Sequence, residues 1–116
     1  MSRDYRVCLE EVLEAAGKVR RYMAGISRED FGTDSKTLDA VIRNLAIIGE
    51  ALKNVSEAIR STYPQVEWRK FAGLRDILIH ACFGVDVDIV WDVIQNKLPV
   101  LESQIAQILS PGRLDT

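Results

Sequence analysis

Histidine and cysteine are scarce in this chain: among 116 residues there is one histidine, His80, and there are two cysteines, Cys8 and Cys82. The cysteines form no CxxC pair, and a single histidine cannot complete a zinc site with them. Two cysteines are also too few for a disulfide framework, so a reducing, cytoplasmic setting fits the composition. We therefore expect no bound metal and no other cofactor.

Long apolar runs are absent as well. No run approaches 18 residues, so no segment is expected to span a membrane. The opening residues, MSRDYR, lack the apolar core of a secretory signal. These absences also favour a protein of the cytoplasm.

There is no excess of positive charge, because 15 Lys and Arg face 17 Asp and Glu, a net charge of −2. Non-specific nucleic-acid binding depends on neutralising many phosphates, so this chain is not a general nucleic-acid binder. Any contact with RNA must come from a local basic patch. The candidate lies within residues 60–80, where four cations stand against Glu67 and Asp76, namely Arg60, Arg69, Lys70 and Arg75.

What is present is an ordinary globular balance, with 47% hydrophobic and 28% charged residues. The length fits one domain, which we place at residues 1–110, followed by a loose tail at 111–116. Apolar residues recur at steps of three and four, the helical period, and no alternating strand pattern competes. The fold class is therefore all-α.

Four helices are predicted from this period, at residues 4–24, 36–61, 68–81 and 87–109. Between the first two, a short capped turn is expected to begin at Ser27. Asp34 or Ser35 is expected to cap the second helix, and Asp86 the fourth. Pro99 lies inside the fourth helix and should kink it near Gln95. Short connections favour a four-helix, up-down antiparallel bundle, with or without one short extra helix.

The chemistry centres on Arg75, Asp76 and His80, which fall near the end of the third predicted helix. Asp76 and His80 are four residues apart, so they share a face and can touch. Asp76 could then orient the imidazole, and the helix dipole would favour its protonated form. Arg75 lies about 140° around the helix from His80, close enough to reach a phosphate in a shared groove.

These residue types suit RNA cleavage by attack of the 2′-hydroxyl on the adjacent phosphorus. Histidine can move protons near neutral pH, and an arginine fork stabilises charge on the phosphoryl oxygens. One histidine cannot easily serve as both base and acid. A symmetric homodimer with its axis near the third helix would bring a second Arg75 and His80 into the same cleft.

Ordinary structural roles compete with each of these assignments. A lone histidine at a helix end is more often a cap or a surface residue, and Asp76 is more often a surface ion-pair partner. Arg69 and Lys70 are candidate RNA contacts, although solvated cations are commoner. Core anchoring is the default for Trp68 and Trp91. Arg43, Asn44 and Glu50 of the second predicted helix have a solvated face as their default. The alternative is that Arg43 or Asn44 faces the cleft.

Three segments, taken together, resemble a known family. They are LDAVIRNLAIIGEA at 38–51, WRKFAGLRDILIH at 68–80, and FGVD at 83–86 continuing to NKLP at 96–99. In this order they are similar to the HepT-like ribonuclease toxins of the HEPN superfamily. The likeness extends over nearly the whole chain.

The resemblance implies a dimeric helical bundle with metal-independent endoribonuclease activity. It assigns the catalytic arginine and histidine to Arg75 and His80 of both protomers, and a common polar position to Asp76. It also implies a toxin–antitoxin module whose partner is an MntA-type minimal nucleotidyltransferase. With the basic patch, the RNA-binding candidates are Arg69, Lys70 and Arg43.

The sequence departs from the family at Cys82. In the best-understood members the partner adenylylates a tyrosine two residues after the histidine, and thiols are not the usual acceptor. Three outcomes stay open: control by occlusion alone, modification of another hydroxyl such as that of Tyr63, or an attenuated toxin. Cys82 itself is either a small, partly buried replacement or a low-pKa thiol near His80. The alternative function is a non-catalytic helical partner that docks a nucleotidyltransferase and positions its substrate.

Overall fold

The computed structural model describes residues 4–80 and 86–110; the side chains of residues 75–80 lie outside that description. The described residues are all-helical, as predicted. The longer helices are α1 (Tyr5–Met23), α3 (Ser35–Lys53), α5 (Trp68–His80) and α7 (Leu98–Leu109). The shorter elements are α2 (Arg28–Thr33), α4 (Glu57–Thr62), α6 (Val87–Asp92) and the π-helix η2 (Val93–Lys97).

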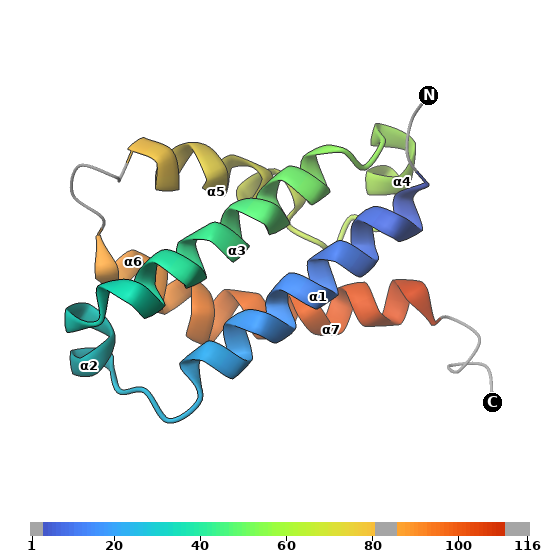
Figure 1. Cartoon of the computed structure of the whole chain (residues 1–116). Coiled ribbons are helices and arrows are strands. Elements are labelled where there is room, and N and C mark those ends of the chain that lie inside the picture. The colour runs from blue at the N-terminus through green and yellow to red at the C-terminus, as the bar shows by residue number, and fades with distance from the viewer. Residues whose placement is uncertain (1–3, 81–85, 111–116) are drawn as a thin grey trace.

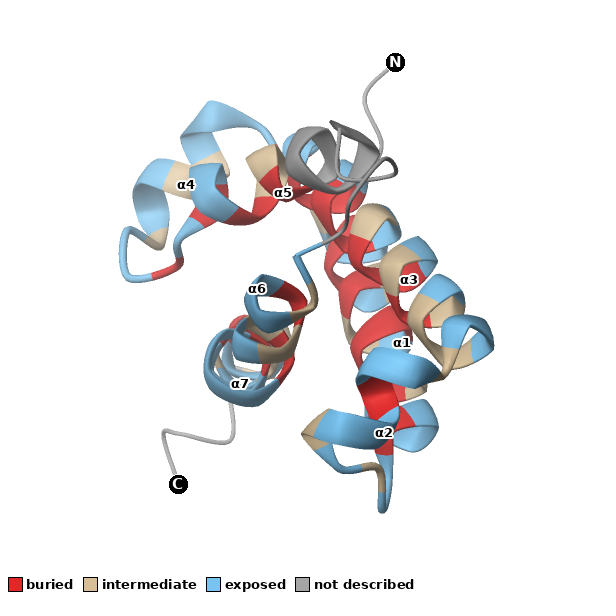
Figure 2. Cartoon of the chain, turned by 90° about the vertical axis from the view of Figure 1, so that its left-hand side faces the viewer, coloured by how far each residue is buried: buried red, intermediate tan, exposed pale blue. Residues whose placement is uncertain are grey.

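Successive long helices run in opposite directions (Figure 1). Helix α3 packs against both α1 and α5, and α1 also packs against α7. The apolar stripes predicted for these helices form the core, and the residues buried completely include Leu9 and Val12 of α1 and Leu45 and Ile48 of α3. Seen from the end of the molecule, the buried positions face inward from α1, α3, α5 and α7 (Figure 2).

Helix α1 begins and ends within one residue of its predicted range because its stripe is regular. Asp4 caps its start by accepting a hydrogen bond from the backbone N–H of Arg6. Asp34 is the residue that caps α3: its Oδ1 accepts from the N–H of Thr37 at 3.0 Å, and its Oδ2 accepts from the Thr37 hydroxyl at 2.6 Å. Both carboxylates satisfy N–H groups that a helix start leaves unpaired.

The single helix predicted at 36–61 is wrong, because the structure divides it into α3 and α4. Helix α3 ends at Lys53, and the hydroxyl of Ser56 caps α4 by accepting from the N–H of Ile59 at 3.3 Å. Val55 between them is buried, so the apolar period continues across the break. A serine hydroxyl can accept a hydrogen bond from a nearby backbone N–H in place of the helical hydrogen bond. Here that hydrogen bond starts a new helix, α4.

The turn predicted at Ser27 is confirmed and is longer than expected. The Ser27 hydroxyl accepts from the N–H of Asp30 at 3.1 Å, and α2 continues to Thr33. This short helix buries Phe31 completely, with its ring centroid 5.9 Å from that of Trp91. Helix α2 therefore closes one end of the core.

The kink predicted near Gln95 corresponds to the π-helix η2. Asp86 caps α6 by accepting from the N–H groups of Asp88 and Ile89, as expected. After α6 the backbone hydrogen bonds span five residues instead of four: the N–H of Leu98 donates to the carbonyl of Val93. Pro99 has no N–H to donate to the Gln95 carbonyl, so the wider turn carries the chain past the missing bond.

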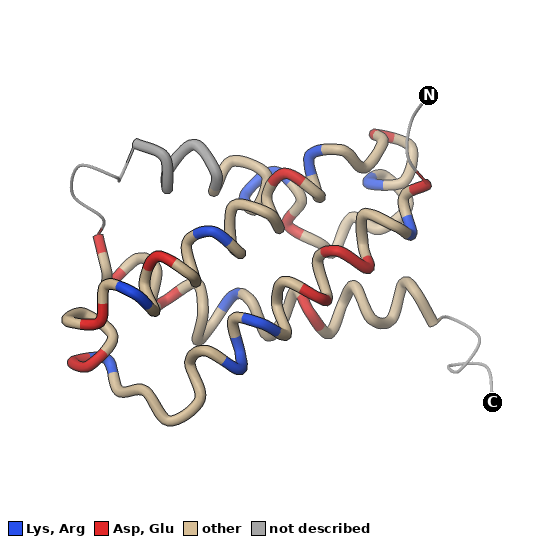
Figure 3. The backbone as a smooth tube through the Cα atoms, viewed as in Figure 1, with Lys and Arg blue, Asp and Glu red and all other residues tan. Residues whose placement is uncertain are grey.

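Ion pairs join α6 and α7 to the first two helices of the chain. Arg28 of α2 donates from Nη2 to Asp88 of α6 at 2.5 Å, and Arg20 of α1 pairs with Glu102 of α7. Lys and Arg are otherwise interspersed with Asp and Glu along the described chain rather than gathered into a field of one sign (Figure 3). Among these residues, no helix is long and apolar enough to cross a membrane.

Candidate functional site

Helix α5 carries most of the residues to which the sequence assigns chemistry. It runs without interruption from Trp68 to His80, so Arg75, Asp76 and His80 all belong to one helix and occupy its last two turns. Their side chains lie outside the described part of the structure, as does the whole of Cys82. The contacts predicted among them therefore stay predictions, and the structure supplies the helix that carries them.

The buried residues of α5 define which side of the helix faces the core. Trp68, Phe71 and Leu74 are each about 5% exposed. With 3.6 residues per turn, positions 69, 73, 76 and 80 fall on the opposite side, within roughly 60° of one another. We call these four positions the outer strip of α5. Position 75 lies outside the strip, on the side of Phe71.

The outer strip is open where the structure describes it. A Cβ built on Gly73 would meet no atom of the described residues within 4 Å. Arg69, at the start of the strip, is exposed. No described segment of this protomer therefore covers the first half of the strip, which leaves that surface available to RNA or to a second protomer.

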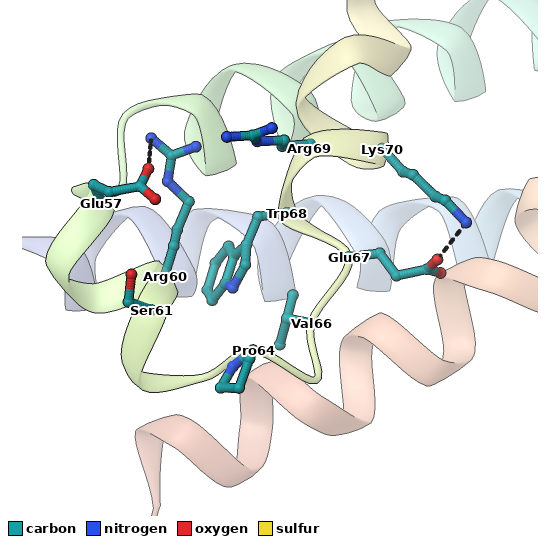
Figure 4. Close-up of a pocket in the computed structure, with 9 residues that line it drawn as sticks. All are labelled: Glu57, Arg60, Ser61, Pro64, Val66, Glu67, Trp68, Arg69 and Lys70. Carbon is teal, nitrogen blue, oxygen red and sulfur yellow. Dashed lines mark ion pairs between the residues drawn. The ribbon is translucent and has the colours of Figure 1, made fainter.

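Arg69 and Lys70 both line a recess at the start of α5, of about 340 Å³ (Figure 4). Helix α4 forms its other wall, and the chain between the two helices forms its floor. The recess is lined by nine residues: Glu57, Arg60, Ser61, Pro64, Val66, Glu67, Trp68, Arg69 and Lys70.

Trp68 holds this recess in shape. Its indole Nε1 donates to the carbonyl of Tyr63 at 2.9 Å, which fixes the connection between α4 and α5 against the helix. The carbonyl of Gln65 in the same connection accepts from Gln104 of α7 at 3.1 Å. Core anchoring is thus confirmed for Trp68, and Trp91 is half-buried against Phe31.

The charges around the recess are unequally paired. Lys70 is tied to Glu67, with 2.6 Å between Nζ and Oε2, and this hydrogen bond lowers the pKa of the Glu67 carboxyl. Arg60 meets Glu57 only at 3.8 Å, the limit of an ion pair. Arg69 forms no hydrogen bond or ion pair with any other described residue. Two guanidinium groups are thus available at the recess, while the lysine is largely engaged.

Arg43 is not brought to this recess. It is an exposed residue of α3, and it is not among the residues that line the recess. Its neighbour Asn44 contradicts the expectation of a solvated face: it is buried, and its Nδ2 donates to the carbonyl of Ala40 at 2.8 Å. Asn44 lines a small hollow between α1 and α3, so it does not face α5. Glu50 is exposed, as expected.

Arg60 belongs to the predicted basic stretch but is not among the predicted site residues. The signal available was the serine cap at Ser56, which starts a separate helix and turns it back toward α5. An apolar groove beside α5 was also missed. It is lined by four apolar residues, Phe71, Leu74, Ile89 and Val93, and by four charged residues, Glu67, Lys70, Asp92 and Lys97.

The family model described as "Ribonuclease HepT-like" matches residues 12–108. The chain belongs to the HepT-like ribonuclease family. It is 40% identical over 108 residues to "Probable ribonuclease HepT" of Thermococcus cleftensis, a match covering 93% of this chain and 98% of the relative. No solved structure matches the chain.

Two further relatives show how HepT-like chains occur. A Caldanaerobacter subterraneus protein named "Putative RNase TTE0752" is 41% identical over 104 residues, which cover 90% of this chain and 93% of that one. A Methanocaldococcus jannaschii protein is 38% identical over 109 residues, 94% of this chain but 49% of the relative. Its name joins a gamma-glutamylcyclotransferase to a putative RNase. The HepT-like chain thus spans about half of that longer protein.

Proposed function

We propose that this chain is a metal-independent endoribonuclease, the toxin of a toxin–antitoxin module, that cleaves RNA with Arg75 and His80 of two protomers. The observation that carries the proposal is the uninterrupted helix α5, which places His80 at the end of a strip that is open at Gly73 and carries position 75 about 140° around the same helix. Relatives named as ribonucleases, aligned along nearly the whole chain, support the same chemistry.

In the proposed reaction, the His80 imidazole of one protomer takes the proton of the ribose 2′-hydroxyl. The 2′-oxygen then bonds to the adjacent phosphorus, and the bond from phosphorus to the 5′-oxygen breaks. The protonated His80 of the second protomer gives its proton to the leaving 5′-oxygen. The products are a 2′,3′-cyclic phosphate and a free 5′-hydroxyl. Arg75 stabilises charge on the phosphoryl oxygens, and Asp76 orients the imidazole.

A homodimer is part of this proposal because one imidazole cannot supply both proton transfers. The apolar groove between α5 and α6 favours a second copy beside the same helix. Ile89, which lines this groove, is 48% exposed and adds its apolar surface to that of Phe71, Leu74 and Val93. A protomer seated there would lie next to the helix that carries the motif.

The test is cleavage of a labelled single-stranded RNA by the purified chain, with EDTA present throughout. We expect the unmodified protein to cut, and His80→Ala and Arg75→Ala to lose at least 100-fold in rate. Arg21→Gln, an exposed cation of α1, serves as the control and should cut normally. Cleavage by His80→Ala at the rate of the unmodified protein would exclude the proposed chemistry. In cells, expression of the unmodified chain should arrest growth, and Arg75→Ala should relieve the arrest.

Cys82 favours a second candidate function, that of a non-catalytic partner of an MntA-like nucleotidyltransferase. Absence of cleavage by every variant, together with capture of a nucleotidyltransferase encoded beside the gene, would select it. If the antitoxin instead controls an active nuclease by modification, Cys82→Tyr should gain an adenylyl group from that enzyme. The unmodified chain should then be restrained by occlusion or at another hydroxyl.

A further inference from the structure

We propose that the recess between α4 and α5 binds a backbone phosphate of the RNA substrate, away from the phosphate that is cut. Arg60 and Arg69 would hold this phosphate from opposite walls. The inference rests on the proposed function for the identity of the RNA, but the binding site is argued from described side chains alone.

The two arginines form an arrangement that suits an anion. Their guanidinium groups point toward one another across the recess (Figure 4). Like charges repel, and the nearest ion-pairing carboxylate, that of Glu57, stands 3.8 Å from Arg60 Nη2 on one side only. A phosphate between them would accept hydrogen bonds from both forks and convert the repulsion into two charge-assisted contacts.

The second observation concerns the Nε donor of Arg60. Its Nε is buried and has no hydrogen-bond partner, although the arginine side chain as a whole is 25% exposed. A buried donor left unpaired destabilises a protein, and such groups in folded structures call for an explanation. A small rotation of the guanidinium toward a bound phosphate would give Nε an oxygen to contact.

The place of the recess on α5 indicates the class of anion. The first turn of α5 contributes Trp68, Arg69 and Lys70 to the lining, and the positive end of the helix dipole lies there. Arg69 also begins the outer strip. His80 follows eleven residues later, about 16 Å along the axis and within about 20° of the same side. A single strand that follows this strip from His80 reaches the recess a few nucleotides away.

The experiment measures binding of a fluorescent 2′-O-methyl RNA of twelve nucleotides by anisotropy at 50–200 mM salt. This RNA has no 2′-hydroxyl to react, so binding is scored whether or not the chain is a nuclease. We expect Arg60→Gln and Arg69→Gln each to raise Kd about fivefold and to reduce the salt slope by nearly one. The double variant should show the same slope as either single one, because both residues serve one phosphate.

Arg21→Gln, an exposed cation on α1, is the matched control and should bind with only a small, slope-neutral change. Arg60→Lys keeps the charge and should recover part of the affinity. Circular dichroism melts confirm that each variant folds. Binding by the two Gln variants that equals the control would overturn the proposal. The proposal would also be overturned if inorganic phosphate bound to the protein, as detected by indole fluorescence, while neither arginine substitution changed the affinity for RNA. Absence of RNA cleavage with intact anisotropy effects would refute the nuclease and leave this site standing.

Discussion

Trp68→Phe tests whether the indole N–H, and not only the apolar ring, holds the start of α5. The substitution removes apolar area worth about 1 kcal/mol at 25 cal/mol per Å². It also removes the donor to the Tyr63 carbonyl, a bond of 2.9 Å in a part-buried setting. That carbonyl keeps a longer bond of 3.3 Å from the N–H of Val66, so the extra loss should be near 1 kcal/mol rather than the full cost of an orphaned acceptor.

Trp91→Phe is the matched comparison. Trp91 is half-buried and its indole makes no hydrogen bond with the described residues, so this change should cost about 1 kcal/mol. Urea unfolding followed by far-ultraviolet dichroism measures both free energies of unfolding, and Trp68→Phe should lose about twice as much. Its Kd for RNA should also rise, because the connection that shapes the recess is released. Equal losses from the two variants would show that the Tyr63 bond contributes nothing.

Two further predictions concern a helix cap and the dimer. Asp34→Ala should lower the free energy of unfolding, because it removes the cap of α3. The Thr37 hydroxyl and N–H lower the pKa of Asp34 below its usual 3.8, so the difference from the unmodified chain should hold above that value and vanish as pH falls through the lower folded pKa. Ile89→Asp should shift the chain toward monomer in light scattering while leaving its unfolding free energy within about 0.5 kcal/mol. Val100→Asp, exposed on α7 outside the groove, should leave the dimer intact; an unchanged mass for Ile89→Asp would place the interface elsewhere.

The helices could be predicted where an apolar stripe was regular. Helix α5 starts at the predicted residue and α1 lies within its predicted range, because burial of one face acts through neighbours in sequence. The division of 36–61 could not be seen in the same way. Val55 and Ile59 continue the period, and whether the Ser56 hydroxyl starts a new helix depends on how the following turn packs.

The candidate site was predictable only as a basic stretch. Arg69 follows from its place on α5, but Arg60 joins it through the turn that Trp68 anchors, a tertiary contact that no spacing reveals. The prediction of a solvated face for Asn44 was wrong for a related reason. Its amide bonds to the carbonyl of Ala40 on its own helix, so a polar residue can be buried against α1 without a partner from another element.

The last prediction concerns Gly73, because glycine destabilises a helix and no contact among the described residues requires a glycine here. Glycine inside a helix costs about 1 kcal/mol relative to alanine, yet a Cβ at this position would meet none of the described atoms within 4 Å. We infer that the missing Cβ allows RNA or the second protomer to approach the outer strip closely. Gly73→Ala should therefore raise the melting temperature by about 4 °C and weaken RNA binding or dimerisation. Gly17→Ala in α1, where a Cβ makes ordinary contacts, should raise the melting temperature by a similar amount and leave RNA binding and dimerisation unchanged. If Gly73→Ala stabilises the chain and leaves RNA binding and dimer mass unchanged, nothing approaches the strip at that point.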